Sequence, residues 1–454
     1  MTALWTQDAL TAATGGSFVA SGFAAEGVAI DSRKITPGEV FVALADARDG
    51  HDFVADALAN GAAGAIVNRL PEGVETAKLL LVDDTQAALE ALGRYGRGRS
   101  DARVVAITGS VGKSTTKEML RRALGAFGTV HGAEASFNNH IGVPLTLARL
   151  PREAAFCVVE IGMNHPGEIA PLARMAAPHA AIVTAVAAAH IGLMGSLEAI
   201  ADEKAEIARG LQAGGAAILP RGPFLSHLAH RVPDGALTIT FGAQTMAEAR
   251  LIAAESDAGG VDVTADILRH VVRFRLAAPG LHMAMNAVAS LAAVAALGLD
   301  VAQAAAALDG FAPLAGRGAR RSLPFRGGEI TLLDESYNAS GASMRAAFDV
   351  LALLPGRRVA VLGDMLELGE HAEDEHAALA DPLAEVADLV FACGPHMRAL
   401  FDALPAAKRG GWAAESEALA DQVAARLAPG DSVLVKGSLG SRMRAVVAAI
   451  EAAR

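Results

Sequence analysis

One stretch constrains the fold of this chain more than any other. The apolar run Arg103-Val-Val-Ala-Ile-Thr108 leads into the turn Gly109-Ser-Val-Gly112, and a helical pattern begins over Lys113-Ser-Thr115. A buried strand, a glycine turn and a helix N-terminus in this order point backbone N–H groups and the positive end of the helix dipole at a phosphate chain. The pattern departs from G-x-x-x-x-G-K-[ST], because Ile107 occupies the first glycine position and the additional glycine is Gly109. The stretch predicts a nucleotide-phosphate site in an α/β domain with a parallel sheet.

The polar groups of this stretch have distinct expected roles. We expect Lys113 to reach the β- and γ-phosphates and the Ser114 hydroxyl to hold Mg²⁺. The remaining contacts of the loop with the nucleotide are expected from Gly109, Ser110, Val111, Gly112 and Thr115. No Asn in the chain is followed by Lys, so the Asn-Lys-x-Asp element with which GTPases recognise guanine is absent. Adenine, and therefore ATP, is the expected nucleotide, and an ordinary strand-turn-helix is the alternative.

The rest of the chain alternates between strand-like and helix-like segments, as is typical of α/β domains. Short β-rich runs followed by turns and helical patterns occur at residues 155–160, 180–184, 216–219, 358–362, 389–392 and 432–435. Polar or glycine-rich stretches at 94–101 and 311–318 interrupt the alternation and are expected to be linkers. We therefore predict three domains, residues 1–99, 100–312 and 313–454, each large enough for its own core.

Charge and cysteine content narrow the class of protein. The 39 basic residues are outnumbered by 50 acidic ones and are scattered, which argues against a protein that binds nucleic acid or an anionic membrane. The longest apolar stretches, 180–189 and 287–299, are too short or too interrupted to span a membrane, and the N-terminal residues lack a signal-peptide pattern. Cys157 and Cys393 lie far apart in apolar runs, which indicates two reduced core thiols. We expect a soluble, cytoplasmic protein.

Lysine is rare in this chain, since the basic residues comprise 32 Arg and only seven Lys. Lys204 lies in a helical pattern at 197–207, where a surface or capping role is the ordinary interpretation. A primary amine can also react with CO₂ to form a carbamate, an anionic oxygen ligand for Mg²⁺, whereas the guanidinium of Arg cannot. No special chemistry is indicated for four lysines that we expect at the surface, Lys34, Lys78, Lys117 and Lys408.

A carboxylate, Glu160, ends the apolar run at 155–160. The C-terminal end of a strand beside a phosphate loop is where a Mg²⁺ ligand is needed, because Mg²⁺ takes one or two carboxylates plus phosphate oxygens. A solvated Glu at the end of a strand accounts for the residue equally well. His190, in the stretch 189–196, taken alone is a surface or capping residue.

Several stretches together resemble the Mur ligase family of peptidoglycan synthesis. They are residues 31–33, 37–44, 49–53, 104–119, 136–145, 159–164, 167–169, 333–339, 361–369 and 433–438. These stretches occur in family order and cover all three predicted domains. They are most similar to the branch of the family that adds D-alanyl-D-alanine to UDP-N-acetylmuramoyl-tripeptide.

The resemblance implies a division of labour among the domains. A small α/β N-terminal domain would hold the UDP end of the substrate through Ser32 and Arg33. The central domain would bind ATP, and a Rossmann-like C-terminal domain would bring the amino substrate and close over the site. In the family, the residues matching Glu160 and His190 help to hold Mg²⁺, and the lysine matching Lys204 is carbamylated.

The same resemblance carries over further contacts. Those implied for adenine, ribose and the rest of the nucleotide are Asn286, Arg317, Tyr337, Asn338 and one of Asp334 and Glu335. Asn138 and Asn139 match residues that face the acceptor and phosphate region. The chain departs from the family pattern after Lys436-Gly-Ser438, where Leu439 and Met443-Arg444 replace the customary residues, so contacts to D-alanyl-D-alanine are not carried over.

The implied reaction forms an amide through an acyl phosphate. ATP would phosphorylate the terminal carboxylate of the tripeptide, and the amine of D-alanyl-D-alanine would displace phosphate. The family resemblance also implies a monomer, and it leaves open whether the third residue of the tripeptide is diaminopimelate or lysine. The alternatives are a related ATP-dependent ligase, of the folylpolyglutamate or UDP-muramoyl-amino-acid type, and a nucleotide-gated scaffolding protein.

Overall fold

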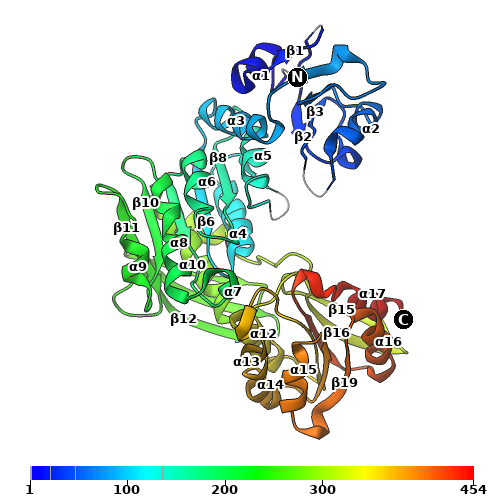
Figure 1. Cartoon of the computed structure of the whole chain (residues 1–454). Helices are drawn as coiled ribbons and strands as arrows, with labels where there is room; N and C mark the ends of the chain where they lie inside the picture. Colours follow the sequence, from blue (N-terminus) through cyan, green and yellow to red (C-terminus); the bar gives the residue numbers. More distant parts are fainter. Residues whose placement is uncertain (1–2, 21, 46–47, 134–136, 454) are drawn as a thin grey trace.

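The structure is a computed structural model that describes residues 3–20, 22–45, 48–133 and 137–453. Met1, Thr2 and Ser136, which belong to stretches considered above, lie outside these residues. Within the described chain the strands form three successive sheets, each flanked by helices (Figure 1). The predicted α/β fold with three successive units is confirmed.

The N-terminal sheet, blue in Figure 1, has the strand order β1-β5-β4-β3-β2. Strands β2 to β5 run parallel, and β1 is antiparallel to β5. The strands are β1 (Ser17–Phe18), β2 (Gly27–Ala29), β3 (Glu39–Val42), β4 (Gly64–Val67) and β5 (Leu79–Leu81), and the helices are α1 (Gln7–Thr14), α2 (Val54–Ala59) and α3 (Thr85–Gly98). Val40 and Ile66 on the central strands are fully buried, as expected for parallel strands covered on both faces.

The first predicted linker is wrong in detail, because most of residues 94–101 belong to α3. This helix packs against α5 (Gly142–Ala148) of the central unit, and Gly96 permits the close approach. A Cβ atom on Gly96 would lie 2.3 Å from the carbonyl oxygen of Leu147. Trp5 adds a second tie, since its indole Nε1 donates to the Ala148 carbonyl at 3.0 Å. A packed helix therefore connects the first two units.

The central unit is built on the sheet β14-β13-β12-β11-β10-β9-β6-β8-β7. Its strands are β6 (Arg103–Thr108), β7 (Val130–Gly132), β8 (Phe156–Glu160), β9 (Ala180–Val183), β10 (Ala216–Pro220), β11 (Leu237–Gly242), β12 (Ala249–Asp257), β13 (Gly260–Ile267) and β14 (His270–Leu276). Its other helices are α4 (Lys113–Gly125), α6 (Ile169–Ala176), α7 (Ile191–Met194), α8 (Leu197–Ala205), α9 (Leu225–Ala229), α10 (Leu281–Ala296) and α11 (Val301–Leu308). Among the described strands of this sheet, the pairings β12–β13 and β13–β14 are antiparallel and all the other pairings are parallel.

The two faces of this sheet carry separate hydrophobic cores. Val105 and Ile107 of β6 pack on one face with residues of α4 and α10, whereas Val104 and Ala106 pack on the other with residues of α5, α6 and α8. This alternation is the period-2 pattern of a strand buried on both faces. The strand order places β6 between β8 and β9. The phosphate loop, which follows β6, therefore begins at the carboxyl edge in the interior of the sheet.

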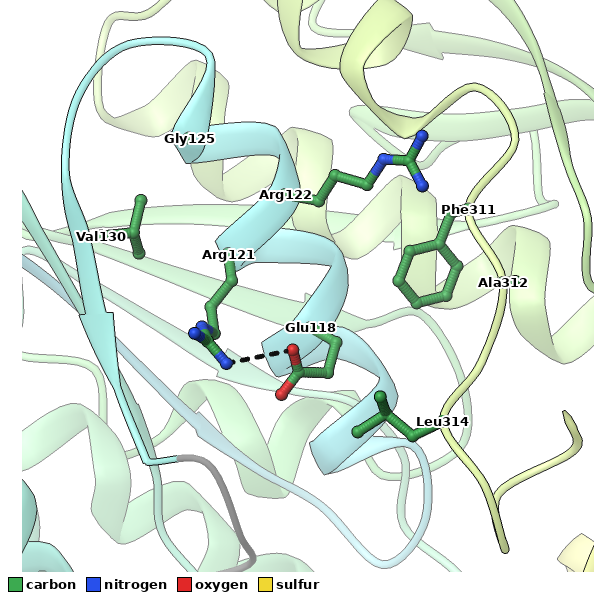
Figure 2. A pocket seen from close by; sticks show the side chains of 8 residues that line it. All are labelled: Glu118, Arg121, Arg122, Gly125, Val130, Phe311, Ala312 and Leu314. Carbon is green, nitrogen blue, oxygen red and sulfur yellow. Dashed lines mark hydrogen bonds and ion pairs between the residues drawn. The ribbon is translucent and has the colours of Figure 1, made fainter.

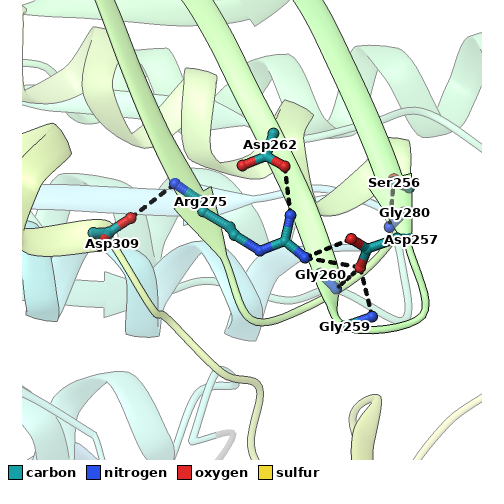
Figure 3. Close-up of polar contacts among 8 residues, drawn as sticks. All are labelled: Ser256, Asp257, Gly259, Gly260, Asp262, Arg275, Gly280 and Asp309. Carbon is teal, nitrogen blue, oxygen red and sulfur yellow. Dashed lines mark hydrogen bonds and ion pairs between the residues drawn. The ribbon is translucent and has the colours of Figure 1, made fainter.

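The antiparallel hairpin β12–β13 is connected by Arg275 to Asp309, the residue that follows α11 (Figure 3). The Arg275 guanidinium donates to both carboxylate oxygens of Asp257 at 2.8 Å and also contacts Asp262. Its backbone N–H donates to Asp309 Oδ1 at 2.9 Å. One residue of β14 thus joins the hairpin tip to the segment that leads into the C-terminal unit.

The C-terminal unit, yellow to red in Figure 1, has the sheet order β15-β16-β20-β17-β18-β19, in which β15 is the antiparallel member among the described strands. Its strands are β15 (Ala319–Phe325), β16 (Gly328–Glu335), β17 (Arg358–Gly363), β18 (Leu389–Cys393), β19 (Arg409–Ala413) and β20 (Ser432–Lys436). Its helices are α12 (Gly341–Ala352), α13 (Ala372–Ala377), α14 (Ala380–Val386), α15 (Met397–Ala403), α16 (Ser416–Arg426) and α17 (Arg444–Ala452). Residues 311–318 contain no helix or strand, as predicted for the second linker.

Two further sequence predictions can be compared with the structure. Cys157 and Cys393 are free and buried, which confirms the prediction of two core thiols. Among the described helices, none is long and apolar enough to cross a membrane.

Candidate nucleotide and ligation site

The phosphate loop has the backbone shape that its glycines permit. Gly109 has φ +145°, and a Cβ atom there would lie 1.9 Å from Thr184 Oγ1 at the end of β9. Gly112 precedes α4 with φ +84°, and a Cβ atom there would lie 2.7 Å from Asn286 Oδ1 on α10. Both positions therefore require glycine. Gly109 thus lies against Thr184, and Asn286 lies against the loop at Gly112.

Lys113 opens α4 and lies across the loop. Its Nζ donates to the Gly109 carbonyl at 2.7 Å. Burial lowers the pKa of Lys113, the charge of Arg317 lowers it further, and the charge of Glu160 opposes both. The predicted phosphate-binding lysine, the strand-end carboxylate and an arginine of the second linker therefore lie within electrostatic range of one another.

Glu160 is only 3 % exposed, so it is not the solvated residue at the end of a strand that was the alternative interpretation. Its Oε2 accepts a hydrogen bond from Ser114 Oγ at 2.7 Å, and its Oε1 accepts one from Asn138 Nδ2 at 2.9 Å. A buried carboxylate beside a hydroxyl is the hard-oxygen donor set that Mg²⁺ prefers. Among the described residues, no group of three or more His, Cys, Asp and Glu side chains could hold a metal ion. A Mg²⁺ ion here would need further oxygen ligands besides Ser114 and Glu160.

Lys204 on α8 is only 2 % exposed, although a surface role was the ordinary interpretation of its helix. Burial holds the pKa of Lys204 well below its usual value, and the charge of Lys113 adds to the effect. The neighbouring Glu203 opposes the shift, but its carboxylate is bound to the backbone N–H groups of Gly167 and Ile169 at 2.8 and 2.9 Å. A lysine in this environment favours the neutral amine, which is the form that reacts with CO₂.

His190 lies at the seam with the C-terminal unit. It precedes α7 with φ +63°, and its Nδ1 forms an ion pair with Glu367 Oε2. The side chain is 22 % exposed. Among the described contacts of the predicted Mg²⁺ ligands, Ser114 and Glu160 bind each other directly, whereas His190 binds a carboxylate of the next unit.

The residues implied for adenine and ribose gather around the second linker. The Arg317 guanidinium carbon lies 3.9 Å from the centroid of the Tyr337 ring, a cation–π geometry. Lys436 Nζ donates to Glu335 Oε2 at 2.7 Å and to the Asn338 carbonyl at 3.1 Å. Adjacent residues of β16 point to opposite faces, so Asp334 lies apart from this group.

Asp334 is instead engaged within its own turn. Its Oδ1 accepts hydrogen bonds from the Ser336 N–H at 3.1 Å and hydroxyl at 2.7 Å, and its Oδ2 lies 3.8 Å from Arg321. A Cβ atom on Gly318 of the linker would lie 3.7 Å from Glu335 Oε1. Of the two alternatives, Glu335 is therefore the carboxylate on the side of Arg317 and the linker.

The implied substrate contacts are distributed over two units. Arg33 is 72 % exposed at its side chain and donates to Asp31 through Nε and Nη2 at 2.9 and 2.8 Å. This contact lowers the pKa of Asp31 to about 2. Ser32 is buried and its carbonyl accepts from Asn60 Nδ2 at 2.9 Å. Asn139 Oδ1 accepts from the N–H of Gly142 at 2.9 Å, at the start of α5, so this oxygen is occupied in the structure.

The prediction of a surface position is wrong for two lysines, Lys117 and Lys408. Lys117 is 1 % exposed, and its Nζ donates to the Ala133 carbonyl at 2.7 Å and lies 3.1 Å from Glu118 Oε1. Lys408 is half-buried and donates to the carbonyls that end α14. The helical spacing of four residues from Lys113 could have indicated that Lys117 faces inward.

A hollow of about 420 Å³ lies at the other end of α4, away from the phosphate loop (Figure 2). It is lined by Glu118, Arg121, Arg122, Gly125, Val130, Phe311, Ala312 and Leu314. Arg121 Nη1 donates to Glu118 Oε2 at 3.3 Å across its floor. None of the residues predicted for the nucleotide site lines it.

Comparisons with known proteins agree with this geometry. Residues 107–294 match the family described as "Mur ligase middle domain", and residues 320–439 match "Mur ligase, glutamate ligase domain". The UDP-N-acetylmuramoyl-tripeptide--D-alanyl-D-alanine ligases of Synechocystis sp. and Bacillus subtilis are 36 % and 35 % identical, over 92 % and 93 % of this chain and 90 % and 92 % of their own lengths.

Solved structures are similar over almost the whole chain. A crystal structure of MurF from Acinetobacter baumannii has a TM-score of 0.87 and 29 % identity, with 99 % of both chains covered. MurF ligase from Thermotoga maritima in complex with ADP has a TM-score of 0.80 and 28 % identity, covering 94 % of this chain and 97 % of that one. The match thus includes the N-terminal unit, which lies outside both matched family domains.

Proposed function

This chain belongs to the Mur ligase family, and from that premise we propose that it joins D-alanyl-D-alanine to UDP-N-acetylmuramoyl-tripeptide with cleavage of ATP to ADP and phosphate. The observation that carries the proposal is the buried contact of Ser114 with Glu160, beside Lys113 and within one electrostatic environment with Lys204. A scaffolding protein would have no need for these four side chains at one site. Relatives that carry the proposed name match more than 90 % of this chain.

ATP binds at the phosphate loop in this proposal. The N–H groups of residues 109–115 and the Lys113 ammonium hold the phosphates, because this backbone and the start of α4 favour negative charge. Asn286, Tyr337 and Asn338 would contact the rest of the nucleotide, and Glu335 is the carboxylate assigned to the ribose. The ADP bound to the Thermotoga maritima neighbour supports the use of this nucleotide.

Mg²⁺ would be held by Ser114, Glu160, His190 and the carbamate of Lys204. It would supply positive charge to the phosphate oxygens during transfer. Lys113 neutralises the same region from the chain itself, so that the tripeptide carboxylate can approach the γ-phosphate. Asn138 donates a hydrogen bond to Glu160 and holds the Glu160 carboxylate in place.

Transfer of the γ-phosphoryl group to the tripeptide carboxylate gives an acyl phosphate, and attack by the dipeptide amine then forms the amide and releases phosphate. The amine loses a proton, and one carboxylate oxygen leaves in the phosphate. Water must be excluded because the acyl phosphate hydrolyses readily. The C-terminal unit packs against α7 through Ile191 and Gly192 and would help to exclude water, and Ser32 and Arg33 would hold the UDP end from the N-terminal unit.

The path through an acyl phosphate can be tested with ¹⁸O. Tripeptide labelled in its terminal carboxylate should transfer one ¹⁸O atom to each inorganic phosphate released, and mass spectrometry should show the pentapeptide product. Unlabelled phosphate formed together with pentapeptide would rule out this mechanism. ADP formation without pentapeptide would exclude the proposed ligase function.

We propose further that the enzyme acts as a monomer in the cytoplasm, where UDP-linked precursors are assembled. Supporting this, the three units contribute all the implied site residues from one chain. Light scattering at working concentration should return the mass of a single 46.3 kDa chain. A stable mass of two or more chains would contradict the monomer.

A further inference from the structure

A second hollow, of about 380 Å³, lies on the central unit and is lined mainly by basic side chains. Its lining residues come from three separate segments: the last turn of α6, the 3₁₀ helix Glu206–Gly210, and the residues that follow α9. They are Arg174, Arg209, His230, Arg231 and Pro233. None of the described residues assigned above to nucleotide, metal or substrate lines this hollow. It is therefore separate from the proposed ligation site.

Close packing brings the basic segments together. A Cβ atom on Gly210 would lie 2.1 Å from the carbonyl oxygen of Ala173, so the 3₁₀ helix is in direct contact with α6. Arg209 and Arg174 are the immediate neighbours of these two residues in the sequence. The third segment is fixed by Leu228 of α9, which is buried in the core that also contains residues of α6 and α8. The positions of the three arginines thus follow from the packing of the unit.

One carboxylate, Glu206, connects two of these arginines. Its Oε2 pairs with Nε of Arg209, and its Oε1 lies 3.0 Å from Nε of Arg231. In the described contacts, the terminal Nη groups of both guanidiniums have no further partner. Three guanidiniums and one carboxylate leave an excess of two positive charges around the hollow, before any charge on His230 is counted.

The structural role expected of a basic residue near a helix C-terminus is filled by other side chains. Such a residue commonly binds the last carbonyls of the helix, and Arg174 lies in the last turn of α6. The carbonyls of Ala176 and Ala177 instead accept from Nε and Nη2 of Arg97, at 2.9 and 3.1 Å. Arg174 forms no ion pair or hydrogen bond among the described contacts. Convergence of like charges on one hollow favours an anion there.

We infer that this hollow binds a phosphate group, at a site additional to the phosphate loop and independent of the proposed ligation. Guanidinium groups present paired N–H donors that match phosphate oxygens. Donors that approach from three segments suit a tetrahedral oxyanion with several oxygens better than a planar carboxylate. Free phosphate, a small phosphorylated molecule and a lipid headgroup share this chemistry. Because the chain is acidic overall, with 50 acidic and 39 basic residues, we assign the site to a small phosphorylated ligand.

The first test measures binding of ³²P-labelled inorganic phosphate to the full-length protein by equilibrium dialysis, with saturating ADP on the phosphate loop. Arg174→Gln should weaken phosphate binding about tenfold or more, because hydrogen bonds to a charged group are lost. Arg273→Gln is the matched control, since Arg273 on β14 is exposed, forms no ion pair among the described residues and does not line the hollow. Lys113→Met should retain the binding, which separates the hollow from the phosphate loop.

The second test identifies the source of the phosphate group by sedimentation with vesicles of phosphatidylcholine, with and without phosphatidic acid. We expect the protein to stay in solution with both. Sedimentation with phosphatidic acid that Arg174→Gln abolishes would overturn the assignment to a small ligand in favour of a lipid headgroup. Thermal unfolding of Arg174→Gln should match that of the unmodified protein, because Arg174 has no described partner to lose.

Two results would overturn the phosphate site itself. One is equal phosphate affinity in Arg174→Gln and the unmodified protein, and the other is the absence of saturable binding of both phosphate and vesicles. These assays contain no tripeptide or dipeptide. Their failure is therefore separate from failure of the ligase function, which is judged by pentapeptide formation.

Discussion

Ser114 Oγ at the start of α4 donates to Glu160 Oε2 at the end of β8, at 2.7 Å, in a buried position. The contact links α4, the helix that follows β6, to the carboxyl end of the adjacent strand β8. It brings together the hydroxyl and the carboxylate that a Mg²⁺ ion on the phosphates of ATP would need.

Glu160→Gln should abolish ligation while the protein remains folded. The amide keeps the shape of the side chain but removes the negative charge, so a fall in kcat of about 100-fold or more is expected for loss of a group that stabilises developing charge. Glu160→Ala should in addition destabilise the fold by about 1–3 kcal/mol, because Ser114 and Asn138 lose a buried partner. Steady-state kinetics and urea unfolding measure the two effects. A Glu160→Gln enzyme with normal kcat would contradict the assigned role.

Lys204→Arg should fold and lose activity, because a guanidinium cannot form a carbamate. Lys204→Ala should also be inactive, but a short carboxylate such as acetate in the assay buffer should restore part of its activity by replacing the carbamate oxygens. Ligation rates with and without added acetate measure the difference, with Lys408→Ala as a control far from the site. An Arg variant of normal activity would exclude the carbamate.

The stability of the protein in CO₂-free buffer should rise with pH because of Lys204. The pKa of this lysine is lowered in the folded protein, whereas in the unfolded chain it stays near 10.5. Between these values the unfolded chain binds more protons, so the contribution to the free energy of unfolding increases with pH, by up to about 1.4 kcal/mol per pH unit. Lys204→Met should be more stable than the unmodified protein at pH 7, and the gap should narrow by pH 9. The same difference in urea midpoint between the two proteins at pH 7 and at pH 9 would disprove this effect.

Gly109→Ala should prevent nucleotide binding and destabilise the central unit. The added Cβ atom would lie 1.9 Å from Thr184 Oγ1, and the φ of +145° is unfavourable for alanine. Gly125→Ala at the end of α4 is the matched control, because a Cβ atom there meets no atom within 4 Å and alanine favours helix by about 1 kcal/mol. Calorimetric titration with ADP and thermal unfolding should separate the two variants. Equal ADP affinity in both would show that the loop tolerates a side chain.

Much of the fold could be predicted from residue patterns. The strand, glycine turn and helix at 103–115 were placed correctly, because apolar runs and glycine constraints act locally. The linker at 94–101 was not, because Gly96 lies inside α3 and permits contact with α5 instead of breaking the helix. Local composition cannot distinguish these two uses of glycine.

The candidate site was predictable in part for the same reason. Lys113 and Ser114 follow from one continuous motif. The burial of Lys117, the choice of Glu335 over Asp334 and the contact of His190 with Glu367 depend on elements that are far apart in the sequence. Such contacts are set by tertiary packing, which a single sequence does not display.

The central claim is tested most directly by phosphate release from ATP with purified protein. Four reactions are compared: protein with ATP alone, with UDP-N-acetylmuramoyl-tripeptide, with D-alanyl-D-alanine, and with both, using tripeptides that end in diaminopimelate or in lysine. We predict release of phosphate above background only when the dipeptide and one of the tripeptides are both present. Equal release with and without D-alanyl-D-alanine would contradict the ligase assignment.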